Sequence, residues 1–459
     1  MSSRRTFFAG GHTGFSAFRT GGSTLHAAGT ASLPWPEVQA LLERGTFPDA
    51  LRGNFAFVWE GPDDTIAAVD HLATIPLFYS DAQVSPIFHT LRATIASPEA
   101  DRECPLEMQI LLGHTVGTRT TCAQIARVEP GHYLARGAQH RFIDLAAIET
   151  DEQAEPGPLA EIVERAVLDR MAPGAENALL LSAGTDSTTL AGITRKLGVE
   201  ERFDYLHLYS DRQWVTEART ALKVAQEMQL PLRMIKVRTS LDELPGDPAR
   251  LRAFWIDSYV GSKILGVCQA GHERSTVFTG ELGDQLYGGP KTELLLHHVL
   301  NRGRADAREI AAVWLNQSHS WNRLSGTRPT PWLEQRFAEE PRFREVYERL
   351  LDHIASVFRS ASTRDLVNRL LLVNLIVKGP VRAYPYSQDT IRWVHPFTDW
   401  HVVEASLRLP SRHKIKGGGV LKAIYQTLWG TWVSPIPFRN AKTGMQIPMQ
   451  SKLVKPVDP

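Results

Sequence analysis

The chain has 459 residues, a net charge of +1 and 43% hydrophobic residues. This balance excludes a basic field over the whole chain, of the kind that binds nucleic acid, and it is typical of a folded protein. One hydrophobic core rarely extends beyond about 250–300 residues, so we expect two domains. The three cysteines, Cys104, Cys122 and Cys268, match neither a metal-ligand spacing nor a disulfide framework.

No segment resembles a signal peptide or a membrane span. The apolar residues near the N-terminus are interrupted at Gly10–Thr13. The most apolar run, Leu370–Val377, contains Asn374 and is too short to cross a bilayer. We therefore expect a cytoplasmic protein.

The first 145 residues or so are predicted to be rich in β-structure. Phe55–Trp59 and Thr65–Val69 are apolar or β-branched runs on either side of a turn at Gly61–Asp64. Residues 143–158 are acidic and rich in turn-forming residues. This change in composition predicts one domain over residues 1–145 and another over residues 158–459.

An alternation of strands and helices follows the boundary. The apolar positions of residues 159–167 share one helix face, and Asn177–Leu181 is a continuously apolar strand of the buried parallel type. The further predicted elements are a helix at Thr188–Leu197, a strand at Phe203–Tyr209, a helix at Val215–Met228 and a strand at Leu232–Val237. Such alternation predicts a doubly wound parallel sheet, and from Lys291 onward the pattern is mostly helical.

A loop of small and hydroxylated residues joins the first strand of this sheet to its helix. The loop reads Ser182-Ala-Gly-Thr-Asp-Ser187. Backbone N–H groups in such a loop can approach an anion, and the N-terminus of the following helix favours negative charge. Asp186 alone would repel a phosphate, so we expect it to bind magnesium; an ordinary helix cap has the same composition. The residues expected to bind the nucleotide here are Ser182, Gly184, Thr185, Asp186 and Ser187.

This hexapeptide resembles the Ser-Gly-Gly-x-Asp-Ser pyrophosphate loop of the ATP pyrophosphatase families. The resemblance implies ATP as a substrate that is cleaved between its α and β phosphates. Ala183 stands where the family has glycine. The extra methyl group is tolerable at negative φ and harmful at positive φ.

A second acidic loop follows a later strand. Val277–Gly289 runs from a strand through a glycine turn to Asp284, a second carboxylate for a magnesium ion. A turn with a capping aspartate would have a similar sequence. The segment resembles the Gly-Glu-Gly-Ala-Asp-Glu-Leu-Phe-Gly-Gly motif of asparagine synthetases, which adds Gly280 and Glu281 to the expected nucleotide site. The positions that differ from the motif are Leu282, Gly283, Gln285 and Tyr287.

A third resemblance lies near the C-terminus. Pro437–Pro448 is similar to the Arg-x-Lys-x-Gly-Phe-x-x-Pro segment of the same superfamily, with one extra residue, and this maps Lys442 onto the family lysine. The resemblance implies that Lys442 stabilises charge at the adenylate and during amide formation, as a fixed cation can. An exposed lysine is the common alternative. Other cations, Lys378 or Lys422, could take the role if this match is misplaced.

The N-terminal half resembles the glutaminase domain of asparagine synthetases in three segments, Leu51–Trp59, Val69–Tyr79 and Val128–Tyr133. The resemblance implies an N-terminal-nucleophile αββα sandwich before the ATP-pyrophosphatase sheet. That domain needs a cysteine at position 2, where this chain has Ser2. A domain kept as a scaffold is expected, with an active serine variant as the alternative, and Asp70 is expected to be structural.

These resemblances imply an ATP-dependent, AMP-forming carboxylate–amine ligase that uses ATP and Mg²⁺. Without glutaminase activity the amine belongs to the substrate, as in lasso-peptide cyclases, which form a macrolactam in a ribosomal peptide; a precursor peptide and its processing protease would then be partners. The alternatives are an asparagine synthetase-like enzyme using free ammonia, a β-lactam synthetase-like cyclase and a non-catalytic nucleotide-binding partner. Asp389 and Tyr384 are the candidates for activating the attacking amine.

Overall fold

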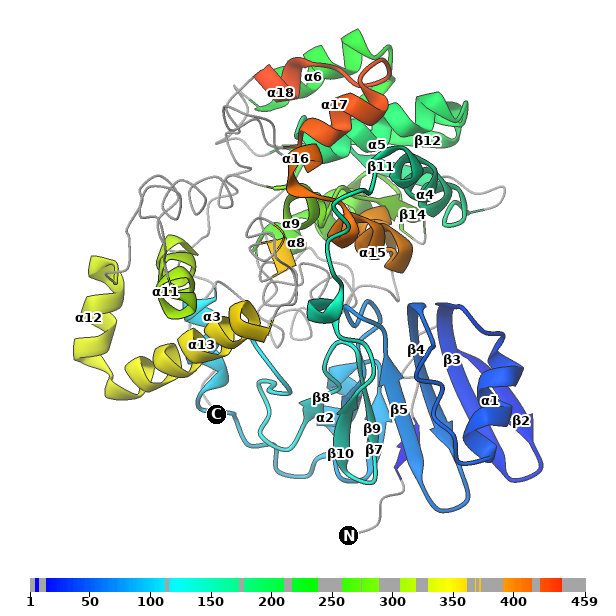
Figure 1. The fold of residues 1–459 in the computed structure, drawn as a ribbon, viewed down its shortest axis with the longest axis vertical. Coiled ribbons are helices and arrows are strands. Elements are labelled where there is room, and N and C mark those ends of the chain that lie inside the picture. The colour runs from blue at the N-terminus through cyan, green and yellow to red at the C-terminus, as the bar shows by residue number, and fades with distance from the viewer. Residues whose placement is uncertain are drawn as a thin grey trace. The chain divides into compact units, whose positions relative to one another are not determined.

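The computed structural model describes residues 5–7, 14–111, 115–172, 177–209, 217–237, 258–273, 275–288, 306–318, 329–360, 368, 371–372, 391–414 and 422–439. By their contacts, residues 1–152 and 288–382 form one compact unit, and residues 153–287 and 383–459 form a second (Figure 1). The predicted domains at 1–145 and 158–459 stay a prediction. None of the described helices is long and apolar enough to cross a membrane.

Two β-sheets form the N-terminal part of the first unit. The strands of the six-stranded antiparallel sheet, in spatial order, are β10 (Ala138–Arg141), β9 (His132–Ala135), β5 (Thr65–Val69), β4 (Gly53–Glu60), β3 (Ser23–Ala31) and β2 (Ser16–Thr20). Those of the four-stranded sheet are β1 (Thr6–Phe7), β7 (Gln83–Ser85), β6 (Phe78–Tyr79) and β8 (Ala126–Arg127). The predicted strands at 55–59 and 65–69 are confirmed as β4 and β5.

The alternation of side chains along β4 explains how these sheets are layered. Ala56 and Val58 pack in a core that includes Val84 of the four-stranded sheet. Phe55 and Phe57 point to the opposite face, where they pack with residues of α1 (Trp35–Glu43). The helix α2 (Phe88–Thr94) packs on the four-stranded sheet. The result is a helix–sheet–sheet–helix arrangement; its assignment as a degenerate glutaminase domain stays a prediction.

Three later helices belong to the same unit. They are α11 (Ala307–Ser318), α12 (Pro331–Glu339) and α13 (Pro341–Ser360). The Tyr347 hydroxyl donates to Asn316 Oδ1 at 3.0 Å and so joins α13 to α11. Arg349 of α13 donates to Glu103, the cap of α3 (Cys104–Ile110), at 2.7 Å and to Glu107 at 3.0 Å. These helices agree with the helical pattern that the sequence predicts after Lys291. A 3₁₀ turn, η1 (Leu145–Ala147), completes the described elements of this unit.

The second unit is built on a five-stranded parallel sheet, which confirms the predicted sheet type. Its strands, in spatial order, are β13 (Leu232–Lys236), β12 (Phe203–Tyr209), β11 (Asn177–Leu180), β14 (Thr276–Phe278) and β15 (Arg392–Val394). Strands β11, β12 and β13 lie where the sequence predicts them. The edge strand β15 was not predicted.

Helices cover both faces of this sheet. Leu180 and Leu206 form a core with Ile264 of α8 (Ser258–Gln269) on one face. Tyr205, the neighbour of Leu206, points to the other face, where its hydroxyl lies 2.7 Å from Thr194 Oγ1 of α5 (Thr185–Lys196). The other helices of the unit are α4 (Gly157–Leu168), α6 (Glu217–Glu227), α9 (Gly283–Tyr287), α15 (Trp400–Arg408), α16 (Ser411–Lys414), α17 (Ala423–Trp429) and α18 (Ile436–Arg439), with 3₁₀ turns η2 (Glu200–Arg202) and η5 (Pro396–Thr398).

Candidate functional site

The strand order places a topological switch point between β11 and β14. From β11 the chain continues to β12 and β13 on one side, and it then crosses to β14 and β15 on the other. Connections that leave neighbouring parallel strands in opposite directions open a crevice at the carboxyl ends of these strands. The two acidic loops of the sequence follow β11 and β14, so the fold brings both to this point.

Hydroxyl groups organise the first loop. Ser187 Oγ accepts a hydrogen bond from the Ser182 N–H at 3.1 Å and lies 3.2 Å from the Gly184 carbonyl oxygen, to which it donates. Ser182 Oγ lies 3.1 Å from Ser187 Oγ. Helix α5 begins at Thr185, three residues before the predicted start, so Asp186 lies in its first turn. The loop and the positive end of the helix dipole therefore coincide, an arrangement that suits a phosphate.

Ala183 adopts a left-handed conformation, with φ of +59°. This is the case in which the methyl group is unfavourable, because a Cβ in the left-handed region costs about 1–2 kcal/mol. Leu282, in the second loop, has φ of +79°. Both residues stand where the motifs that the two loops resemble have glycine. The backbone therefore keeps the glycine-like shape of both loops although the glycines are replaced.

The two loops touch at two glycines of the second loop. A Cβ added to Gly280 would lie 2.7 Å from Asp186 Cβ, and one added to Gly283 would lie 2.1 Å from Asp186 Oδ1. At Gly280 the added Cβ would also lie 2.8 Å from the Ser187 backbone nitrogen, so this position requires glycine, whereas at Gly283 the side chains of Asp186 and Tyr425 would have to shift. The contact brings Asp284, which follows Gly283, beside Asp186.

A lysine from a third segment joins the two carboxylates. Lys422 Nζ lies 2.6 Å from Asp186 Oδ1, 2.5 Å from Asp186 Oδ2 and 2.5 Å from Asp284 Oδ1. The Lys422 side chain is 4% exposed. The Tyr425 hydroxyl donates to Asp186 Oδ1 at 2.8 Å. Burial, with the nearby Asp186 charge, raises the pKa of Tyr425 well above its usual value, so this hydroxyl stays a donor.

The donor set fits a magnesium ion that is bound together with a nucleotide. The Lys422 ammonium stands in for a cation, and its contacts show that oxygens of Asp186 and Asp284 can converge on one positive charge. Magnesium is commonly held by one or two carboxylates together with substrate phosphates. In the part of the chain that the structure describes, no group of three or more histidine, cysteine or acidic side chains is placed to hold a metal by itself. Substrate phosphates could complete the coordination.

A second polar cluster adjoins the Gly280 loop. Glu281 accepts from Lys263 of α8 at 2.5 Å, and the Lys263 side chain is 7% exposed. Thr279 Oγ1 lies 2.7 Å from His395 Nδ1, which links the ends of β14 and β15. Burial lowers the pKa of His395 to about 4, so the imidazole is neutral at physiological pH. Glu281 thus lies in an ion pair beside the predicted phosphate site.

The predicted site residues divide into two groups. Those expected to bind nucleotide or metal, in the 182–187 and 280–284 loops, come together at the switch point. The predicted catalytic residues Lys442, Asp389 and Tyr384 lie outside the described residues, as does Ser2. The sequence offers Lys422 only as an alternative to Lys442. Its contact with Asp186 joins residues 236 positions apart, and no local sequence pattern predicts such a contact.

Asp70 of the first unit is fully buried and organises a turn. It accepts from the Phe55 N–H at 2.9 Å, the Leu72 N–H at 2.8 Å and the Thr74 N–H at 3.2 Å. Burial raises the pKa of this carboxyl to about 6. Such a set of backbone donors is what holds a turn together, and it favours the structural role expected for Asp70.

Two of the solved structures to which the chain is similar are distant in sequence. One is a glutamine-dependent NAD+ synthetase from Acinetobacter baumannii in complex with adenosine diphosphate, with 13% identity over 44% of this chain and 44% of that chain and a TM-score of 0.20. The other is the U34-tRNA thiolase NcsA from Methanococcus maripaludis with its [4Fe-4S] cluster, with 14% identity over 45% of this chain and 89% of that chain and a TM-score of 0.19. These scores are too low to support an argument.

No curated protein sequence matches the chain. The profile of the asparagine synthase family does match, over residues 158–458. That range contains both acidic loops and the lysine that joins them, and it is well over half of the chain. The chain belongs to the asparagine synthase family.

Proposed function

We propose that this protein activates a carboxylate as an acyl-adenylate with ATP and couples it to an amine. Membership of the asparagine synthase family supports an ATP-dependent ligase of this general kind. The observation that carries the proposal is the convergence of Asp186 and Asp284 on one cation at the switch point. Two carboxylates from two loops, beside a helix N-terminus, suit a magnesium nucleotide better than a metal alone.

The chemistry has two displacement steps. A carboxylate oxygen of the substrate attacks the α-phosphorus of ATP, and pyrophosphate leaves. The amine then attacks the acyl carbon, AMP leaves and the amine loses a proton. Ser182, Ser187 and the first turn of α5 would hold the departing pyrophosphate, while Asp186 and Asp284 would hold magnesium, which neutralises the phosphates when bound. Lys442 would stabilise the negative charge that develops in both steps.

The finer proposal is that the acid and the amine belong to one ribosomal peptide, so that the product is a macrolactam. The replacement of the expected nucleophilic cysteine by Ser2 supports it, because a chain without glutaminase activity makes no ammonia from glutamine and so takes its amine from the substrate or from free ammonia. A precursor peptide and its processing protease would then be partners. The proposed site of action is the cytoplasm, where ATP is available.

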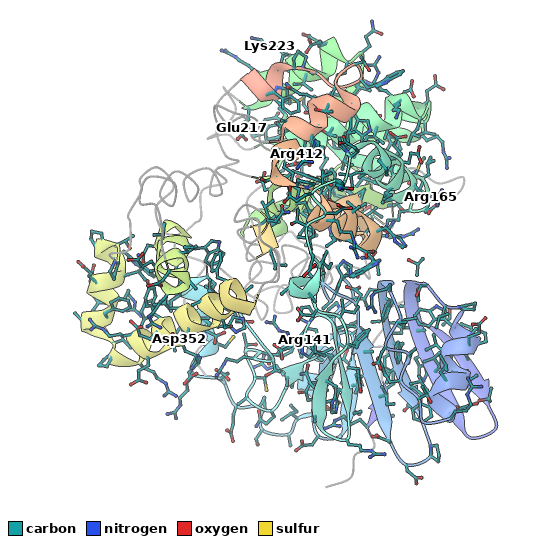
Figure 2. All side chains as sticks on the ribbon, in the orientation of Figure 1. Arg141, Arg165, Glu217, Lys223, Asp352 and Arg412 are labelled. Atoms are coloured by element: carbon teal, nitrogen blue, oxygen red, sulfur yellow. The ribbon has the colours of Figure 1, made fainter. Side chains whose placement is uncertain are left out.

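The products of ATP test the first part of the proposal. With substrate, magnesium and ATP, AMP and pyrophosphate should form in equal amounts, whereas ADP and phosphate would rule out adenylation. Asp186→Asn and Asp284→Asn should each abolish AMP formation, since each removes a charged oxygen ligand from a hard cation. Asp352→Asn, at an exposed position of α13 that Figure 2 labels, is the matched control and should leave it unchanged.

The nature of the amine tests the finer part. A cyclised peptide should weigh less than its precursor by the mass of one water. The Ser2→Ala variant should cyclise the precursor at the wild-type rate. Glutamate released from glutamine and lost in Ser2→Ala would indicate a serine glutaminase instead. If the protein forms an amide from free ammonia, or closes a small β-lactam ring, its substrate is a small molecule and not a peptide.

A further inference from the structure

Lys422 is a counterion of both acidic loops in this structure. Its ammonium contacts both oxygens of Asp186 and one of Asp284 while the side chain is almost fully buried. Asp284 itself is more open, with a side chain 37% exposed. A buried ammonium is stable only when it is paired, and a carboxylate stripped of its partner in such a place is costly. Lys422 and the two aspartates therefore stabilise each other.

The backbone of Lys422 is held at the start of a helix. Lys422 has φ of +57° and forms the N-cap of α17. At the other end of this helix, the Trp429 indole N–H donates to Glu164 of α4 at 2.9 Å. Beyond it, Val433 lies so close to Gly192 of α5 that a Cβ on this glycine would be 2.5 Å from Val433 Cγ2. The lysine is thus carried by a helix that is anchored to α4 and α5.

A divalent cation and the Lys422 ammonium need the same oxygens. The Lys422 ammonium offsets part of the charge of the two carboxylates, so a dication that arrives alone has to compete with the ammonium for them. The phosphates of a nucleotide change this balance, because they can accept the ammonium while the carboxylates turn to the metal. Metal and nucleotide should therefore favour each other's binding at this site.

We propose that Lys422 couples the entry of magnesium to the entry of its nucleotide, by neutralising Asp186 and Asp284 until a nucleoside triphosphate brings phosphates for the ammonium to bind. The proposal rests on the proposed use of a magnesium nucleotide at this site. Lys422 acts on the metal through the two aspartates and is a positioning residue in this sense. The consequence is a site that discriminates against free metal ions.

The test measures metal affinity directly. Mn²⁺ replaces Mg²⁺ as the probe, and its free concentration is followed by electron paramagnetic resonance, with and without a non-hydrolysable ATP analogue. In the wild type the analogue should tighten Mn²⁺ binding strongly. In Lys422→Gln, Mn²⁺ alone should bind about tenfold more tightly than in the wild type, because the competing ammonium is gone. In Lys422→Gln the ATP analogue should increase the Mn²⁺ affinity less than it does in the wild type, since the ammonium that couples the two ligands is absent.

The controls separate competition from a general loss of charge. Lys223→Gln removes one charge from an exposed position of α6, which Figure 2 labels, and should bind Mn²⁺ as the wild type does. If Lys422→Gln folds poorly, Lys422→Met gives a second neutral variant. In either variant Mn²⁺ should raise the thermal midpoint more than in the wild type, because a bound ligand stabilises the folded state.

Equal or weaker Mn²⁺ binding by both Lys422 variants, or an unchanged effect of the analogue, would overturn the inference. If the wild type forms AMP and pyrophosphate in a separate assay with substrate, magnesium and ATP, the inference alone fails. If ATP is not converted to AMP at all, the proposed function fails, whatever the Mn²⁺ affinities show.

Discussion

Gly283 lies so close to Asp186 that a β-carbon on the glycine would stand 2.1 Å from the carboxylate oxygen Oδ1. That oxygen also accepts from Lys422 and Tyr425. No rotation of a methyl group could relieve the overlap, so either the loop or the carboxylate must shift. The position of the acid therefore depends on the absence of a side chain in the neighbouring loop.

Gly283→Ala should abolish AMP formation while most of the fold is retained, because the shift occurs between two site loops. The measurement is AMP production together with the thermal midpoint. Gly157→Ala is the control: at this position of α4 a Cβ would meet nothing within 4 Å, and φ is not positive. Full activity in Gly283→Ala would show that the loops are farther apart than described.

Ala183→Gly should stabilise the second unit by about 1 kcal/mol, because glycine removes the cost of a left-handed Cβ. The gain is limited by the greater freedom of glycine in the unfolded chain. Chemical denaturation measures the free energy of unfolding. Ala191→Gly, inside α5, should lower it by more than this amount, since glycine is unfavourable within a helix and the change also removes a buried methyl group. A loss of stability in Ala183→Gly would contradict the strain at this position.

His395 should make the second unit sensitive to mild acid. Its folded pKa of about 4 lies below the ordinary value of 6.5 because the imidazole is buried. Between these values the unfolded chain takes up a proton that the folded chain does not, so the free energy of unfolding falls as the pH is lowered from 6.5 toward 4. Over this pH range the free energy of unfolding should fall by about 3 kcal/mol in all.

Thermal and denaturant unfolding of wild type and His395→Gln across this pH range measure the difference. Glutamine can still form a hydrogen bond with Thr279, but it does not titrate, so the variant should show a flatter dependence. Parallel curves for the two proteins would mean that His395 is protonated as easily in the folded state as in the unfolded chain.

Lys442→Ala should lower kcat by about 10²–10³-fold with little change in the KM for ATP, because a cation that acts on the transition state contributes little to ground-state binding. Lys442→Arg should not restore the rate, since a planar guanidinium does not replace a compact ammonium. Single-turnover kinetics give both constants. Lys455→Ala, in the same C-terminal segment, is the control and should leave both unchanged. A wild-type kcat in Lys442→Ala would move the role to another cation.

The sequence predicts the sheet of the second unit well, because buried parallel strands such as Phe203–Tyr209 are short and rich in apolar and aromatic residues. It misses β15, since Arg392–Val394 is only three residues long and carries no periodicity. Helix α5 begins earlier than predicted because Thr185 and Asp186 resemble cap residues but lie inside the helix. Short elements and helix starts depend on tertiary contacts that local patterns do not contain.

The candidate site is predicted only in part for the same reason. Asp186 and Asp284 could be found because each lies in a loop with its own pattern. Lys422 has no such pattern, and its role is visible only when the ends of β11 and β14 and the start of α17 are placed together. The α8 lysine Lys263, which pairs with Glu281, was missed likewise.

The left-handed residues Ala183 and Leu282 have a consequence for recognising related proteins. A pattern search that demands glycine at these two positions would reject this chain, although its backbone follows the path that the glycines are there to permit. The steric requirement lies instead at Gly280, where the backbone of the neighbouring loop leaves no room for a side chain. A search pattern that requires glycine only where a side chain would clash would therefore find divergent members of the family. A pattern that also requires glycine at every residue with positive φ would discard them.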